Sequence, residues 1–128
     1  MHELPATQGM LDVALDAAAA AGSVRIREIH LVVGDLSSMV DDSVQFYFDI
    51  LSKGTAAEGA VLRFRRERAW LACGGCGVRE EIKPPLPPAC PRCDDLRVTV
   101  TGGQAFYVDS IEVDEPGGVT ASPNGGVG

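Results

Sequence analysis

The sequence has few aromatic residues, an excess of acidic over basic side chains, and no long apolar run. Aromatic residues make up 5% of the 128 residues, so we expect a core built from Val, Leu, Ile and Ala. Lys and Arg number 11 against 18 Asp and Glu, and the resulting net charge of −7 argues against nucleic-acid binding through phosphate neutralisation. No segment approaches the roughly 18 consecutive apolar residues of a membrane-spanning helix. We therefore predict no nucleic-acid partner and no membrane partner.

The N-terminus lacks a basic segment followed by an apolar stretch, so we expect no secretory signal peptide and a cytoplasmic location. The sequence also lacks a phosphate-binding loop of the G-x4-G-K-[ST] type. Its few serines have no histidine nearby in the sequence to activate them. We therefore predict that the protein is not an enzyme.

Four cysteines form two C-x2-C pairs that are separated by thirteen residues. They are Cys73, Cys76, Cys90 and Cys93. Two such pairs at this spacing indicate a closed tetrahedral metal site, for which structural Zn(II) is the usual occupant. Iron bound as in rubredoxin, two disulfides and a redox-active pair are the alternatives. Disulfides are disfavoured because the cytosol keeps thiols reduced.

The spacing of apolar residues predicts two helices and three strands. The helices are expected over 5–21 and 41–53, and the strands over 24–33, 60–67 and 106–113. In the second helix, the predicted apolar stripe consists of Val40, Val44, Tyr47, Phe48 and Leu51. A Pro-rich loop follows the first cysteine pair and is too poor in donors for a central strand.

This order of elements predicts a discontinuous domain with an insertion. Residues 1–67 and 102–115 would form the main domain, residues 68–101 the zinc-binding module, and residues 116–128 a disordered tail rich in Gly and Pro. The predicted fold class is α+β. It consists of a small two-helix domain with a three-stranded mixed sheet and an inserted four-cysteine module of the zinc-ribbon or rubredoxin-like kind.

The first three residues can chelate a metal ion. The α-amine of Met1, the amide nitrogen of His2 and the imidazole of His2 are adjacent donors, and Glu3 can supply a fourth through its amide nitrogen or side chain. Nitrogen-rich tetragonal or square-planar ligation favours Ni(II) or Cu(II) over Zn(II). An incidental histidine near the terminus is the alternative interpretation. The other histidine, His30, lies inside a predicted strand and is interpreted as structural.

In combination, these features resemble the HypA/HybF family of hydrogenase nickel-incorporation proteins, over about residues 1–115. The matching segments are Met1-His2-Glu3-Leu4, Val33-Gly34-Asp35-Leu36-Ser37, Val44-Gln45-Phe46-Tyr47-Phe48, Lys53-Gly54-Thr55, the two cysteine pairs and Ile111-Glu112-Val113. The cysteine pattern alone is shared by many zinc modules, whereas its combination with an N-terminal Met-His-Glu is specific.

The resemblance implies a nickel metallochaperone. It implies that Ni(II) is bound at Met1, His2 and Glu3, with His2 as the essential side chain, and that Zn(II) is structural in the four-cysteine module. It also implies two partners, a HypB-type GTPase and the large subunit of a [NiFe]-hydrogenase, with urease served as well in some bacteria. We expect a monomer or a weak homodimer.

The sequence departs from the family pattern at three places. Asp35 stands where Glu is usual, Pro5 stands where Ser is common, and the cysteine module contains no histidine to complete a nickel site. The fourth nickel donor therefore stays open between the Glu3 backbone, water and a group from a partner.

Two other functions remain open from the sequence. One is a zinc-ribbon module that binds nucleic acid or a protein complex, suggested by a basic run at Arg63, Arg65, Arg66 and Arg68. The other is a rubredoxin-like electron carrier with iron on the four cysteines.

Overall fold

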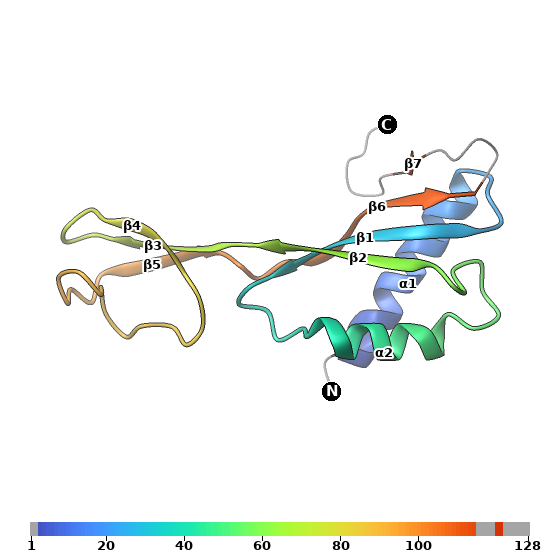
Figure 1. The fold of residues 1–128 in the computed structure, drawn as a ribbon. Helices are drawn as coiled ribbons and strands as arrows, with labels where there is room; N and C mark the ends of the chain where they lie inside the picture. The colour runs from blue at the N-terminus through green and yellow to red at the C-terminus, as the bar shows by residue number, and fades with distance from the viewer. Residues whose placement is uncertain (1–2, 115–119, 122–128) are drawn as a thin grey trace. The chain divides into compact units, whose positions relative to one another are not determined.

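The structure is a computed structural model that describes residues 3–114 and 120–121. Within these residues, two α-helices and seven strands follow one another (Figure 1). In order they are α1 Glu3–Ala20, β1 Ile26–Gly34, α2 Asp41–Leu51, β2 Val61–Glu67, β3 Ala69–Cys73, β4 Arg79–Ile82, β5 Val98–Gly102, β6 Phe106–Val113 and β7 Thr120–Ala121. The predicted α+β class with a four-cysteine insertion between β2 and β6 is confirmed.

The chain divides into two compact units. The first contains Met1–Val32, Ser38–Arg65 and Phe106–Gly128, and the second contains Val33–Ser37 and Arg66–Ala105. The larger sheet has the strand order β2-β1-β6-β7, and α1 packs against α2 and β6. Among the described residues, no helix is both long and apolar enough to cross a membrane.

Helix α1 is present as predicted, but it begins two residues earlier, at Glu3 rather than Pro5, and ends at Ala20 rather than Ala21. Its buried apolar residues recur every three or four positions and therefore lie on one face: Met10, Leu11, Ala14 and Ala18. Gly22 ends the helix with φ of +75°, a left-handed conformation that glycine adopts without steric cost. In that turn the N–H of Ser23 donates to the carbonyl of Ala18 at 3.0 Å, which satisfies one of the last helical carbonyls.

Helix α2 buries a narrower stripe than predicted. Val44 and Phe48 are fully buried, and Tyr47 and Leu51 are partly buried. Val40, which the prediction included, is 53% exposed because it is the residue before the helix and has an extended backbone with φ of −112°.

The strands of the larger sheet match the prediction with small shifts. Strand β1 begins at Ile26 rather than Val24, which is 89% exposed, because a turn held by the Ser23 hydroxyl precedes it. The sheet also gains the two-residue strand β7, which pairs antiparallel with Ile111 and Glu112. Thr120 and Ala121 belong to the predicted disordered tail but form β7, and the rest of that tail lies outside the described residues.

The second unit is built on a three-stranded antiparallel sheet with the order β4-β3-β5. Its core is small and consists of Ala69, Leu71 and Ile82, with Leu36, Val98 and Val100 packed against them. No strand is predicted in this region, because Arg79–Ile82 has no apolar alternation and is extended through its pairing with β3. Such a small core leaves this unit dependent on a further stabilising element.

Candidate metal centre

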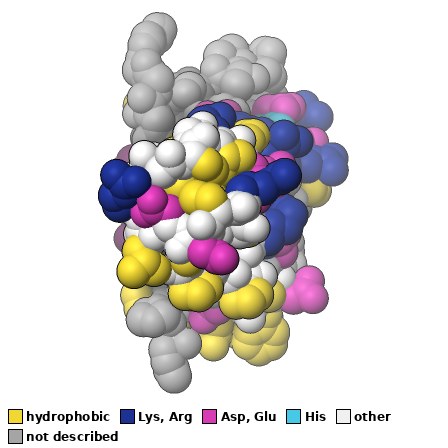
Figure 2. Space-filling model, turned by 90° about the vertical axis from the view of Figure 1, so that its left-hand side faces the viewer, with side chains coloured by type: hydrophobic (Ala, Val, Ile, Leu, Met, Phe, Trp, Pro, Cys, Tyr) yellow, Lys and Arg dark blue, Asp and Glu magenta, His cyan; other side chains and the backbone are white. Residues whose placement is uncertain are grey.

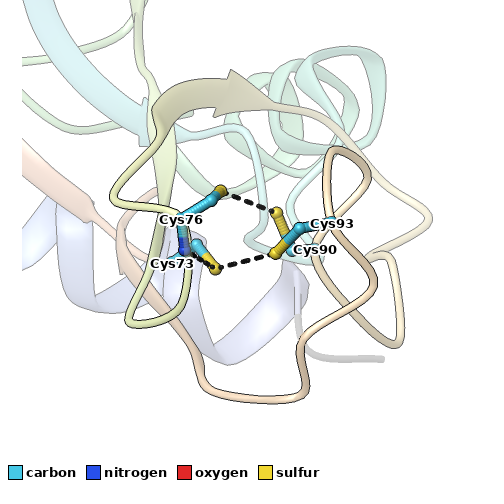
Figure 3. Close-up of side chains that lie close together, drawn as sticks. All are labelled: Cys73, Cys76, Cys90 and Cys93. Atoms are coloured by element: carbon cyan, nitrogen blue, oxygen red, sulfur yellow. Dashed lines mark hydrogen bonds between the residues drawn. The ribbon is translucent and has the colours of Figure 1, made fainter.

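The four cysteines converge in the second unit. Cys73 ends β3, Cys76 lies in the turn that follows, and Cys90 and Cys93 lie in the loop before β5. Figure 3 shows all four side chains pointing toward one another. The sulfurs of Cys73 and Cys93 are 3.6 Å apart and those of Cys76 and Cys90 are 3.8 Å apart.

Two tight turns produce this convergence. After Cys73 the N–H of Gly77 donates back to the Cys73 carbonyl at 3.1 Å, and Gly77 takes a φ of +78°. After Cys90 the N–H of Asp94 donates to the Cys90 carbonyl at 2.8 Å, with a φ of +63° at Asp94. Asp is one of the few non-glycine residues that tolerate this left-handed conformation. Each C-x2-C pair therefore turns back on itself and presents both sulfurs to one point.

Backbone amides point at the sulfurs. The Cys73 sulfur accepts from the N–H groups of Gly75 at 3.2 Å and Cys76 at 3.4 Å, and the Cys90 sulfur accepts from Arg92 at 3.3 Å. The N–H of Cys76, followed by that of Gly75, lowers the pKa of Cys73 to about 7. Because these donors favour the thiolate, they prepare the Cys73 sulfur for metal coordination.

The Cys93 thiol differs from that of Cys73. The N–H of Asp95 favours its thiolate, but burial and hydrogen bonds to the other three thiols outweigh it and raise the pKa of Cys93 to about 12. Close packing of four sulfurs thus opposes ionisation of all four together unless a cation lies among them. A bound metal removes this conflict, since its positive charge stabilises the thiolates.

The distances fit a tetrahedral metal site and exclude disulfides. All four ligand atoms lie within 4.8 Å of one another. Sulfurs at the usual distance from Zn(II) in a tetrahedron are about 3.8 Å apart, close to the separations given above. A disulfide requires about 2.05 Å, so the four thiols are free. The donor set therefore suits zinc, and it suits iron in the same geometry.

Asp95 supports the second turn, a role that the sequence analysis missed. Its carboxylate accepts from the Arg97 backbone N–H at 2.7 Å and from the Arg97 guanidinium at 2.8 Å. The guanidinium of Arg97 holds the pKa of Asp95 below its usual value. A Cβ on Gly75 would overlap this carboxylate, with the Asp95 Cγ only 2.8 Å away. This is an Asx turn, in which an Asp side chain accepts from the backbone N–H two residues later. An Asp in a loop next to a cysteine pair is the sequence signal for it.

The predicted nickel ligands lie at the other end of the sequence. Met1 and His2 lie outside the described residues, whereas Glu3 is the first residue of α1. Glu3 lies in the first turn of α1, where its acidic side chain is favoured by the positive end of the helix dipole.

The basic run does not form a uniform positive surface. Arg63 contacts Glu28 at 3.2 Å, Arg65 lies 4.0 Å from Asp109, and Arg68 lies 3.9 Å from Glu81. On the face shown in Figure 2, Lys and Arg side chains are interspersed with Asp and Glu. This arrangement argues against the nucleic-acid alternative, because three of the four arginines of the run have an acidic neighbour. The fourth, Arg66, donates to the carbonyl of Gly34 at 3.4 Å.

The described residues thus form a small α+β protein with a four-cysteine group that could hold a metal ion. The chain matches the family described as "Hydrogenase/urease nickel incorporation, metallochaperone, hypA" over residues 1–113. It therefore belongs to the HypA family, and the resemblance proposed from the sequence is confirmed. This is a family of metallochaperones and not of enzymes, as predicted.

Individual relatives cover nearly the whole chain. The hydrogenase maturation factor HypA of Caldanaerobacter subterraneus subsp. tengcongensis is 38% identical over 115 residues, which span 89% of this chain and 100% of the relative. That of Dehalococcoides mccartyi is 39% identical, with coverage of 90% and 96%. The solution structure of the Ni metallochaperone HypA from Helicobacter pylori has a TM-score of 0.60 and 18% identity, covers 87% of this chain and 96% of that chain, and shares the fold.

Proposed function

We propose that this chain binds Ni(II) through Met1, His2 and Glu3 and delivers it, with a HypB-type GTPase, to the large subunit of a [NiFe]-hydrogenase. Delivery to urease is the second destination that the family description allows. In this proposal the four cysteines hold a structural Zn(II). The observation that carries it is the family match, which begins at residue 1 and includes the three proposed ligands.

The chemistry of the N-terminus supports nickel as the cargo. An amine, an imidazole and backbone amide nitrogens form a tetragonal nitrogen-rich donor set, which Ni(II) prefers over Zn(II). The acidic side chain of Glu3 in the first turn of α1 adds a negative charge beside the ion. Deprotonated amides close to a helix N-terminus are favoured by the positive end of the helix dipole. The proposed site thus draws its protein donors from three consecutive residues, Met1, His2 and Glu3.

The two sites suit different tasks. The N-terminal donors come from three consecutive residues, so a partner can replace them one at a time during transfer. The cysteine donors come from two turns that are 13 residues apart and complete a closed tetrahedron, in which no coordination position stays open. We therefore assign nickel exchange to the terminus and structural support to the four cysteines.

Zinc is preferred over iron at the cysteine site for a reason of function. A chaperone needs a fixed module, and Zn(II) has no redox chemistry that would change its geometry. The rubredoxin-like alternative predicts a red protein, because an iron tetrathiolate is coloured, whereas a zinc-loaded protein is colourless. Metal analysis of the protein purified from cells grown without added metal distinguishes the two.

Nickel delivery is tested in cells that lack the chromosomal copy of this chain. We expect the wild-type chain to restore hydrogenase activity at low nickel, and the His2→Ala variant to restore it only when nickel is added in excess. The Gln8→Ala variant is the control, since Gln8 is an exposed residue of α1 and is not one of the proposed nickel ligands. Full rescue by His2→Ala at low nickel would contradict the proposed role of His2.

A further inference from the structure

Three possible metal ligands outside the sites described above converge on the larger sheet. The His30 Nε2 atom lies 2.9 Å from Oε2 of Glu112 and 3.5 Å from Oε1 of Glu28. The candidate ligand atoms of these three residues all lie within 4.8 Å of one another. The side chains are 34% exposed for His30, 35% for Glu112 and 21% for Glu28, so solvent reaches the group.

The backbone of the sheet fixes this arrangement. Glu28 and His30 are two residues apart on β1 and therefore share one face, whereas Ile29 and Leu31 between and beyond them are buried on the other. Strand β6 is the neighbour of β1 in the sheet. Glu112 on β6 lies between the buried residues Ile111 and Val113 and so projects with His30. Side chains held by neighbouring strands lose little further freedom when they bind an ion.

We propose that Glu28, His30 and Glu112 form a second, exchangeable site for a divalent first-row cation such as Ni(II) or Zn(II). One imidazole nitrogen and two carboxylate oxygens are ligands that such borderline ions accept, and the two carboxylates match the ion's charge. Donor atoms about 2.1 Å from one ion are about 3.0–3.4 Å apart in octahedral or tetrahedral geometry. The separations of 2.9 and 3.5 Å around His30 fall close to this range.

Three protein ligands leave coordination positions for water, which distinguishes this site from the closed cysteine site. Binding replaces the hydrogen bond between His30 and Glu112, and it requires the Nε2 atom of His30 to be unprotonated. The ion would thus enter from solvent and leave by ligand exchange.

Arg63 sets the affinity of the proposed site. Its Nε atom donates to Oε1 of Glu28 at 3.2 Å, and its Nη2 atom donates to Oε2 of Glu28 at 3.5 Å. This positive charge competes with a metal ion for Glu28, so removal of the charge is expected to strengthen metal binding. If these residues only interacted with one another across the strands and bound no metal, Arg63→Gln would remove an ion pair and would not affect metal binding.

The test uses the full-length chain with the cysteine site loaded with Zn(II) and the His2→Ala substitution in place. Ni(II) and Zn(II) are titrated separately by calorimetry. We expect one further ion per chain, at least tenfold weaker binding in His30→Gln and in Glu112→Gln, and tighter binding in Arg63→Gln. Asp109→Asn, which removes a carboxylate from the same strand outside the three ligands, is expected to bind as the parent does. Circular dichroism checks that each variant is folded.

A second measurement does not depend on any ligand substitution. In the ¹⁵N spectrum of the parent protein, Zn(II) is expected to shift the imidazole signals of His30. The inference is overturned if the parent binds no further ion, if His30→Gln binds it unchanged, or if the His30 signals do not move. These outcomes leave the N-terminal proposal intact, because that site is defined by the ion lost between wild type and His2→Ala.

Discussion

Gly34 at the end of β1 and Gly103 after β5 lie backbone against backbone within the second unit. The N–H of Leu36 donates to the Gly103 carbonyl at 2.7 Å, and the N–H of Gly34 donates to the Ala105 carbonyl at 2.7 Å. A Cβ on Gly34 would overlap the Gly103 carbonyl and approach the Ala105 nitrogen to 2.7 Å. The glycine of the Gly34-Asp35-Leu36-Ser37 segment therefore serves the approach of two chain segments.

Gly34→Ala is expected to destabilise the protein by about 1–3 kcal/mol, because backbone atoms must move to admit the new methyl group. The free energy of unfolding from urea titration of the zinc-loaded protein measures this. Gly9→Ala is the control, since a Cβ at Gly9 meets nothing within 4 Å and alanine favours the helix by up to about 1 kcal/mol. Equal stability of Gly34→Ala and wild type would show that the two segments separate at no cost.

Cys73→Ala is expected to abolish zinc binding and to disorder the second unit while the helices remain. Its core of Ala69, Leu71 and Ile82 is too small to hold three strands without the metal. Zinc content from plasma mass spectrometry and amide chemical-shift dispersion over residues 69–102 are the measurements. Thr99→Ala, at an exposed position of β5, is the control, and we expect it to keep the zinc content and the chemical-shift dispersion of the wild type. A dispersed spectrum of the zinc-free variant would contradict metal-dependent folding.

Asp35 pairs with Lys83 inside the second unit, at 3.2 Å. The carboxylate of Asp35 raises the pKa of Lys83 above its usual 10.5. Because the pKa is raised in the folded state, the stabilisation is present below the ordinary value and is lost as the pH rises through the folded value. Asp35→Asn is therefore expected to lower Tm near neutral pH, and the difference from wild type narrows above about pH 10.5.

The conservative variant Asp35→Glu is expected to restore the wild-type Tm, since Glu keeps the charge and is the residue usual at this position in the resemblance described above. Differential scanning calorimetry at several pH values measures all three proteins. A Tm difference that does not depend on pH would show that Asp35 acts through its packing rather than through Lys83.

An extension of a few residues before Met1 is expected to weaken nickel binding at least tenfold, because it converts the α-amine into an amide. Calorimetric titration with Ni(II) measures the change. The same extension placed after Gly128 is the control and is expected to leave nickel affinity unchanged. Zinc content is expected to be equal in both proteins. Unaltered nickel affinity in the N-terminally extended protein would exclude the amine as a ligand.

Local sequence signals predicted the elements that depend on local structure. Strand β6 was predicted at its observed bounds, because it is rich in aromatic and β-branched residues and because glycines precede it. Strand β4 was missed, because Arg79–Ile82 becomes extended only through its pairing with Ala69–Ala72. Its start is also held by the stacking of Arg79 on Trp70, 4.3 Å from the ring centre, a contact between residues that no local pattern links.

The two groups of possible metal ligands also differ in whether local sequence or long-range strand pairing brings them together. The four cysteines were predicted from spacing, because each C-x2-C pair forms its own turn. The group of Glu28, His30 and Glu112 was not predicted, since 82 residues separate His30 from Glu112. Only the order of strands in the sheet brings β1 beside β6, and that order cannot be read from the spacing of the three residues.

Metal stoichiometry after nickel loading tests the central claim most directly. Wild type and His2→Ala are loaded with Ni(II), desalted and analysed for nickel and zinc per chain. We predict that His2→Ala retains one zinc ion but carries one nickel ion fewer than wild type, with an unchanged fold. Equal nickel content in the two proteins would contradict the assignment of the nickel site to the N-terminus.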